Sequence, residues 1–236
     1  PKPSSAASDV YKRQVMATGC LSSANMPDVP GRDTFAGILA HTGRYPKDGI
    51  DFTGKRVGIV GTGSSGIQAI PVIARTAGHL TVFQRTAQFT IPARNGPLDP
   101  AEQAAVKAEY AAFRERNRQM AGAFGSKFPV PVTDAVDVDD ETFTSTMASL
   151  WEQGGTMFLS AFRDLMRNPA ANERAAAFVR GKIAEIVHDP ATAARLTPDG
   201  LIGCKRLVID SGYYETYNRP NVSLVDISGR GTPITE

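Results

Sequence analysis

One glycine-rich turn constrains this chain more than any other feature. The residues Gly61-Thr-Gly63-Ser-Ser-Gly66 follow the apolar run 57–60 and precede a helix-like stretch over 67–77. Strand, glycine turn and helix in this order form the context that a G-x-G-x-x-G motif requires. The first glycine permits a tight turn, the second lets a pyrophosphate approach the backbone, and the third lets the helix pack close to the strand. The motif therefore predicts dinucleotide binding, with a ligand-free strand-to-helix turn as the alternative.

The end of the next strand-like run bears on which dinucleotide is bound. Residues 80–83 read as the second strand of a β-α-β unit, and Gln84-Arg85-Thr86 follow with no carboxylate. An NAD site typically has an acidic residue about 20 positions after the glycines, which binds the ribose 2′-OH. Arg85 can instead bind a 2′-phosphate through a bidentate, charge-assisted contact. The pattern favours NADP(H) over NAD(H), with a merely solvated surface arginine as the alternative.

Composition and charge narrow the class of protein. The chain has 236 residues, 42% of them hydrophobic, a formal net charge of +2 and a pI near 8.7. This balance predicts a packed globular core and favours neither nucleic acid nor a membrane surface as a partner. Two cysteines, Cys20 and Cys204, are too few for a disulfide framework and indicate a reducing, cytoplasmic setting. They do not have metal-ligand spacing, so we expect no metal site.

The expected organisation has five parts. They are a disordered or foreign segment over 1–14, a strand end and linker over 15–54, a β-α-β unit over 55–98, a helical insertion over 99–190, and a return to the sheet domain over 191–236. Periodicity predicts helices over 101–120, 140–150, 156–166 and 172–188, the last ended by Asp189-Pro190. Trp151, Phe158 and Phe162 are expected to pack in the core of the insertion.

A second motif lies upstream of the glycine turn. Phe35, Gly37, His41 and Pro46 match the pattern F-x-G-x-x-x-H-x-x-x-W-[P/D], with Tyr45 in place of tryptophan. With this motif the chain resembles the Baeyer–Villiger monooxygenases, which are flavoenzymes that insert oxygen beside a ketone. Further resemblance, in family order and over about residues 15–236, runs through Ala17–Gly19, Gly61–Gln68, Phe83–Thr86, Ala93–Asn95, Lys205–Arg206 and Gly212–Asn218.

The resemblance implies a Rossmann-like NADP-binding domain with a helical insertion, in an α/β fold from which the FAD domain is largely missing. Such enzymes open with an FAD-binding glycine motif in a segment that precedes residue 15 here. We therefore expect the chain to be an internal fragment that is inactive by itself. In the family His41 belongs to the linker between the nucleotide domains, which suggests a part in domain movement.

The resemblance also implies roles for individual residues. The pyrophosphate would be held by Thr62, Gly63, Ser64, Ser65, Gly66, Ile67 and Gln68. The 2′-phosphate would be held by Arg85, Thr86 and Lys205. Arg206 would be the catalytic arginine beside flavin and nicotinamide, where a permanently charged guanidinium suits the negative charge that develops on oxygen and does not act as a stray proton donor. By itself the pair Lys205-Arg206 would read as a basic surface patch.

The implied activity is NADPH- and O₂-dependent oxidation of a small-molecule ketone to an ester or lactone, with FAD as second cofactor. One alternative is an N- or S-oxygenating flavin monooxygenase, against which the motif at 35–46 and Lys205-Arg206 argue. Another alternative is a non-catalytic NADP(H)-binding module.

Overall fold

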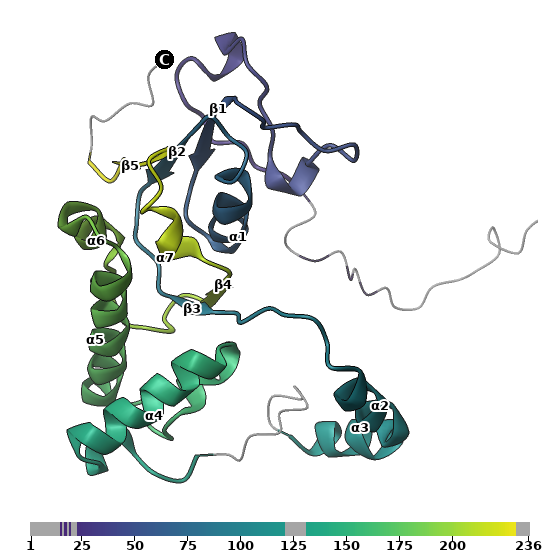
Figure 1. Cartoon of the computed structure of the whole chain (residues 1–236), viewed down its shortest axis with the longest axis vertical. Coiled ribbons are helices and arrows are strands. Elements are labelled where there is room, and N and C mark those ends of the chain that lie inside the picture. Colours follow the sequence, from purple (N-terminus) through teal and green to yellow (C-terminus); the bar gives the residue numbers. More distant parts are fainter. Residues whose placement is uncertain (1–14, 16, 18, 20–22, 121–130, 230–236) are drawn as a thin grey trace, which may run out of the picture. The chain divides into compact units, whose positions relative to one another are not determined.

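The computed structural model describes residues 15, 17, 19, 23–120 and 131–229, and the expectation for residues 1–14 lies outside them (Figure 1). The described residues belong to two compact units, one within 1–51 and the other within 52–233. In the first unit, 3-10 turns η2 (Arg32–Thr34) and η3 (Thr42–Arg44) are the regular elements. The expected strand end before Gly19 remains a prediction, because only Val15, Ala17 and Gly19 of that stretch are among the described residues.

The second unit contains two small parallel sheets. Strands β1 (Arg56–Val60), β2 (His79–Gln84) and β5 (Val222–Asp226) pair in the order β1-β2-β5. The pair β3 (Thr90–Pro92) and β4 (Val208–Asp210) forms the other sheet. Every pairing is parallel, with Val57 opposite Leu80 and Leu80 opposite Val222 in the first sheet. A parallel pair requires a crossover, and helix α1 (Ser64–Ile73) provides it between β1 and β2. The predicted α/β fold is confirmed.

Helix α1 and the first sheet share one core. Ile67 and Ile70 on α1 are fully buried, as are Leu80 and Val82 on β2. Strand β2 alternates half-buried and buried side chains, which is the period-2 pattern of a strand with one well-covered face. The buried face therefore holds the glycine turn rigidly at the end of β1.

The described part of the segment between β3 and β4 is mostly helical. Its helices are α2 (Pro100–Ala108), α3 (Tyr110–Gln119), α4 (Asp140–Gln153), α5 (Pro169–Ile186) and α6 (Pro190–Leu196), with 3-10 turns η4 (Ala135–Asp137) and η5 (Thr156–Ser160), and the short helix α7 (Tyr213–Thr216) follows β4. Trp151 and Phe158 meet edge to face with ring centroids 6.2 Å apart, and Phe162 stacks on Phe143. All three predicted core aromatics, Trp151 among them, are buried.

Two of the expected helices differ from those in the structure. The expected helix 101–120 is interrupted at Glu109, whose backbone angles leave the helical range. The expected helix 156–166 stops as the turn η5, because Arg163 N–H bonds the Thr133 carbonyl and the Asp164 carboxylate accepts the Ala135 N–H. These tertiary bonds take the place of helical ones.

Asp189-Pro190 follows the end of α5 and also begins the next helix, α6. Proline is tolerated in the first turn of a helix, where its missing N–H has no helical partner in any case. The Asp189 carboxylate accepts the Thr192 N–H at 2.9 Å and so caps α6, which begins at Pro190. The limits of the five parts expected from the sequence remain predictions.

Candidate dinucleotide site

The glycine turn has the geometry that the motif requires. Gly61 adopts φ +99°, a left-handed conformation that favours glycine, and its N–H bonds the Phe83 carbonyl at 2.9 Å. A Cβ on Gly66 would lie 2.3 Å from the Gly61 carbonyl oxygen. A Cβ on Gly63 would meet no atom within 4 Å. The first and third glycines are therefore needed by the turn itself, whereas the second faces open space that a ligand can enter.

The N-terminus of α1 opens onto the same space. Gly63 is its N-cap and supplies no side-chain cap, and the first helical bond runs from Ile67 N–H to the Gly63 carbonyl at 2.9 Å. The N–H groups of residues 64–66 come before that bond. Ser64 and Ser65 are exposed. Such N–H groups, with the partial positive charge of the helix N-terminus, suit a pyrophosphate.

The end of β2 is tied to this turn. Thr62 is buried, and its hydroxyl donates to the Thr86 carbonyl at 2.9 Å. The side chains of Arg85 and Thr86 are exposed beside this bond. The structure thus brings two of the three residues expected to hold the 2′-phosphate, Arg85 and Thr86, to the strand end that adjoins the glycine turn.

Two residues of the expected pyrophosphate cradle have other contacts. The side chain of Ile67 is fully buried in the core. The Gln68 amide donates to the Ile209 carbonyl at 3.2 Å and so links α1 to β4. Any contribution of Ile67 to the cradle comes from its main chain, and Gln68 already has one structural role.

Lys205 and Arg206 are exposed on the segment that enters β4. The Gln88 amide donates to the Arg206 carbonyl at 3.1 Å. The Gln88 carbonyl in turn accepts the Tyr214 hydroxyl at 3.2 Å. Residues 205–206 are thereby held against the connection that follows Arg85 and Thr86. The sequence did not single out Gln88, because a glutamine in a loop carries no motif.

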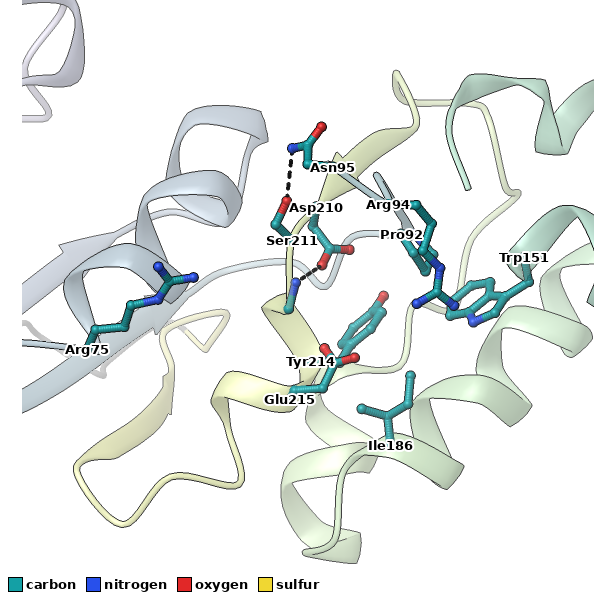
Figure 2. A pocket seen from close by; sticks show the side chains of 11 residues that line it. Arg75, Pro92, Arg94, Asn95, Trp151, Ile186, Asp210, Ser211, Tyr214 and Glu215 are labelled. Atoms are coloured by element: carbon teal, nitrogen blue, oxygen red, sulfur yellow. Dashed lines mark hydrogen bonds between the residues drawn. The ribbon is translucent and has the colours of Figure 1, made fainter. Parts of the chain in front are cut away.

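A pocket of about 460 Å³ lies elsewhere in the second unit, and none of the expected site residues lines it (Figure 2). Several of its polar side chains are paired, either with one another or with neighbouring residues. Arg94 forms an ion pair with Glu152 at 2.9 Å, and the Asn95 amide donates to the Ser211 hydroxyl at 3.1 Å. The Asp210 carboxylate accepts the Thr90 hydroxyl and two main-chain N–H groups. This lining favours a structural junction over a ligand site.

The tyrosines beside this pocket belong to the scaffold. Tyr213 and Tyr214 are almost fully buried, and burial raises the pKa of both hydroxyls well above the usual range. Tyr217 donates its hydroxyl to Tyr213 at 3.0 Å. These hydroxyls therefore stay neutral and serve as hydrogen-bonding partners that fix α7.

In the first unit, the segment 35–46 has a local structure of its own. The His41 Nδ1 accepts the Gly43 N–H at 3.0 Å and caps η3, and the Tyr45 hydroxyl accepts the Ile50 N–H at 3.2 Å. Phe35, Ile38 and Leu39 are exposed. The hydroxyl of Tyr45 thus makes a hydrogen bond within this segment.

No group of three His, Cys, Asp or Glu side chains among the described residues could hold a metal ion. Within the same residues, no helix has the length and apolar character needed to cross a membrane. Cys204 is a free, exposed thiol, while Cys20 lies outside the described residues.

Known proteins match most of this chain. It is 42% identical over 224 residues to cyclohexanone 1,2-monooxygenase of Acinetobacter sp, covering 94% of this chain and 40% of that protein. It is 40% identical over 227 residues to a Baeyer–Villiger monooxygenase of Pseudooceanicola batsensis, covering 95% and 41%. It is also 43% identical over 215 residues to a phenazine N-monooxygenase of Lysobacter antibioticus, covering 90% and 39%. No family model matches the chain.

Solved structures give the same result. A steroid monooxygenase bound to NADP is 51% identical with a TM-score of 0.81, covering 87% of this chain and 39% of that one. A complex of the protein OTEMO with FAD and NADP is 40% identical with a TM-score of 0.85, covering 90% and 41%. The chain spans about two fifths of the length of these relatives. Over the segment that it spans, the chain is similar in sequence to a Baeyer–Villiger monooxygenase and in fold to steroid and cyclohexanone monooxygenases.

Proposed function

We propose that this chain is the NADPH-binding portion of a flavoprotein monooxygenase that converts a ketone to an ester or lactone with NADPH and O₂. The observation that carries the proposal is the open space at Gly63, bordered by the N-terminus of α1 and by exposed Arg85 and Thr86. The residues present fit a phosphorylated dinucleotide, because N–H groups and a guanidinium both favour phosphate. The likeness to NADP-bound relatives supports the same cofactor.

Each part of the site has a separate task in this proposal. The N-terminus of α1 binds the pyrophosphate through residues 62–68. Arg85, Thr86 and Lys205 bind the 2′-phosphate and select NADPH over NADH. When bound, FAD supplies the oxygen-transfer chemistry and NADPH supplies the hydride. No residue of this chain is assigned to FAD.

Arg206 is the proposed catalytic residue. Its guanidinium would stabilise negative charge on the reacting oxygens. A lysine at this position would lack the planar fork and would recover little activity. Arg206 is exposed in this chain, as a residue facing a bound cofactor must be before the cofactor arrives.

The test is a graft of residues 15–236 into the matching region of the Acinetobacter cyclohexanone monooxygenase. We expect Arg206→Ala to lower ester formation about 10²- to 10³-fold while NADPH still binds. Arg167→Ala, which removes another exposed arginine, is the matched control. Full ester formation by the Arg206→Ala graft would show that the assignment is wrong.

A second reaction has a specific observation in its favour. The phenazine N-monooxygenase is as similar to this chain as the ketone-oxidising relatives are. N-oxygenation of a heteroaromatic ring is therefore the second candidate. Product analysis of the graft with cyclohexanone and with phenazine distinguishes the two.

The partners and location follow from the same proposal. The substrates are a small-molecule ketone and O₂, and the chain is proposed to bind neither nucleic acid nor membrane. We propose a cytoplasmic location because two cysteines suit a reducing compartment. Fractionation of the cells that produce the natural protein tests the location.

A further inference from the structure

Gln88 connects two segments of the site that are far apart in the chain. It lies between β2 and β3, two residues after Thr86, and two residues of chain span at most about 7 Å. Its amide donates to the Arg206 carbonyl at 3.1 Å. One side chain thus joins the β2 end, with Arg85 and Thr86, to the segment with Lys205 and Arg206.

The main chain of Gln88 is itself fixed. Its carbonyl accepts the Tyr214 hydroxyl at 3.2 Å, and the same hydroxyl accepts the Thr90 N–H at 3.3 Å. Tyr214 is only 2% exposed. The amide of Gln88 is therefore presented from an anchored backbone, so its bond to Arg206 can hold a neighbouring segment in place.

The other side of the Lys205–Arg206 segment has a separate anchor. The buried Asn172 amide donates to the Ile202 carbonyl, and its oxygen accepts the Ile202 N–H at 3.1 Å. Asn172 lies on α5, so this bond fixes the segment to the helical insertion and not to the β2 end. Of these two side-chain anchors, Gln88 is the one that ties the segment to the β2 end. The pairing of Thr90 with Val208 fixes the chain only from two residues after Arg206 onward.

We propose that Gln88 is a positioning residue that holds Lys205 where it completes the 2′-phosphate site, so that it contributes to the preference for NADPH over NADH. The inference rests on the proposed function. Lys205 carries one flexible ammonium group, and its contribution depends on where its main chain starts. Without the Gln88 bond, the Lys205 side chain would have to be ordered when NADPH binds. This cost weakens the binding of NADPH and leaves the binding of NADH unaffected, because NADH has no 2′-phosphate.

The test compares two cofactors on the 236-residue chain. Gln88→Met keeps the length of the side chain and removes the donor without adding charge. We expect it to weaken NADPH binding about 3- to 10-fold in a fluorescence titration and to change NADH binding less than 2-fold. Gln103→Met, on the exposed surface of α2, is the matched control and should change neither. Equal weakening of both cofactors would overturn the inference, because a purely structural role acts on both.

A double-mutant cycle tests whether Gln88 acts through Lys205. We expect Lys205→Ala to weaken the binding of NADPH and not that of NADH. In the Lys205→Ala background, Gln88→Met should weaken NADPH binding no further. Full additivity, or no effect of Lys205→Ala, would overturn the inference. If the unaltered chain binds NADPH no better than NADH, the proposed function fails and the inference fails with it. If the unaltered chain prefers NADPH and Gln88→Met keeps that preference, the inference alone fails.

Discussion

Arg85 is the residue on which the predicted preference for NADP(H) over NAD(H) depends. It lies at the end of β2, where an NAD site typically has a carboxylate. Its backbone neighbour Thr86 is held to the glycine turn by the bond from the Thr62 hydroxyl. The guanidinium is exposed, and it needs no conformational change of the sheet to meet a phosphate. The residue type sets the charge and the strand sets its position.

Arg85→Ala should weaken NADPH binding roughly 10- to 150-fold, equivalent to about 1.5–3 kcal/mol for a lost charge-assisted contact. NADH lacks the 2′-phosphate, so its affinity should stay nearly constant. The measurement is a titration of both cofactors against the unaltered chain and against Arg85→Ala, with Arg167→Ala as control. Equal weakening toward both cofactors would remove the 2′-phosphate role.

At the scale of elements, the turn before α1 gives two glycines opposite roles. Gly63 has φ −82° and ψ 179°, angles open to any residue, and a Cβ there meets open space. Gly66 has a main-chain oxygen of Gly61 where its Cβ would be. One glycine leaves room for a ligand, and the other lets the helix approach the turn.

Gly63→Val should abolish binding of NADPH and NADH and leave the melting temperature nearly unchanged, because its side chain occupies the space of the pyrophosphate and clashes with nothing else. Gly66→Ala should instead destabilise the second unit by about 1–3 kcal/mol through overpacking against a backbone atom. Thermal melts and cofactor titrations on both variants separate the two effects. Normal NADPH binding by a folded Gly63→Val chain would contradict the pyrophosphate assignment.

Helix α6 also supports the site, because its Arg195 carbonyl accepts the amide of Gln84, the residue before Arg85. Hydrogen bonds from the Thr192 hydroxyl and N–H hold the pKa of its cap, Asp189, below the usual range. A lowered folded pKa means that this contribution to stability is complete above the unfolded pKa of about 3.9 and is lost as pH falls through the folded value.

Asp189→Asn should make acid unfolding less steep below about pH 4, because asparagine can still cap α6 but does not titrate there. Asp189→Ala should lower stability near neutral pH, where the carboxylate is charged and bonded. Urea unfolding at a series of pH values measures both effects. If the stability of Asp189→Asn falls with decreasing pH as steeply as that of the unaltered chain, this cap does not contribute to acid unfolding.

At the scale of the whole molecule, cofactor binding and stability are linked within the second unit. The proposed site uses the turn at 61–66, the strand end at 84–86 and the segment at 205–206, and the helical insertion separates the last of these from the first two. A ligand that binds only the folded arrangement stabilises it by mass action. The whole unit, and not one loop, should therefore respond to NADPH.

NADPH at 100 times its dissociation constant should stabilise the second unit by about 2.7 kcal/mol, which raises its melting temperature by roughly 5–11 °C for a unit of this size. The same concentration of NADH should raise it much less. Differential scanning calorimetry measures both shifts. An equal shift with the two cofactors would contradict selection through the 2′-phosphate.

Local signals in the sequence determined the α/β class and the glycine turn, and they predicted Arg85 as a phosphate ligand. They did so because a tight turn, a strand end and a helix start are each set by a few consecutive residues. The family resemblance added Thr86 to that prediction. The family motifs added Lys205 and Arg206, which charge and spacing alone would have left as a surface pair.

Only the tertiary structure decided how these pieces meet. Gln88 and Arg206 are 118 positions apart, and neither has a local pattern that predicts the bond between them. The expected helix over 156–166 yields to bonds from Arg163 and Asp164 to the chain near residue 134, and local periodicity does not encode such bonds. Residue chemistry is local, but the placement of one residue against another depends on contacts that form only when distant segments pack together.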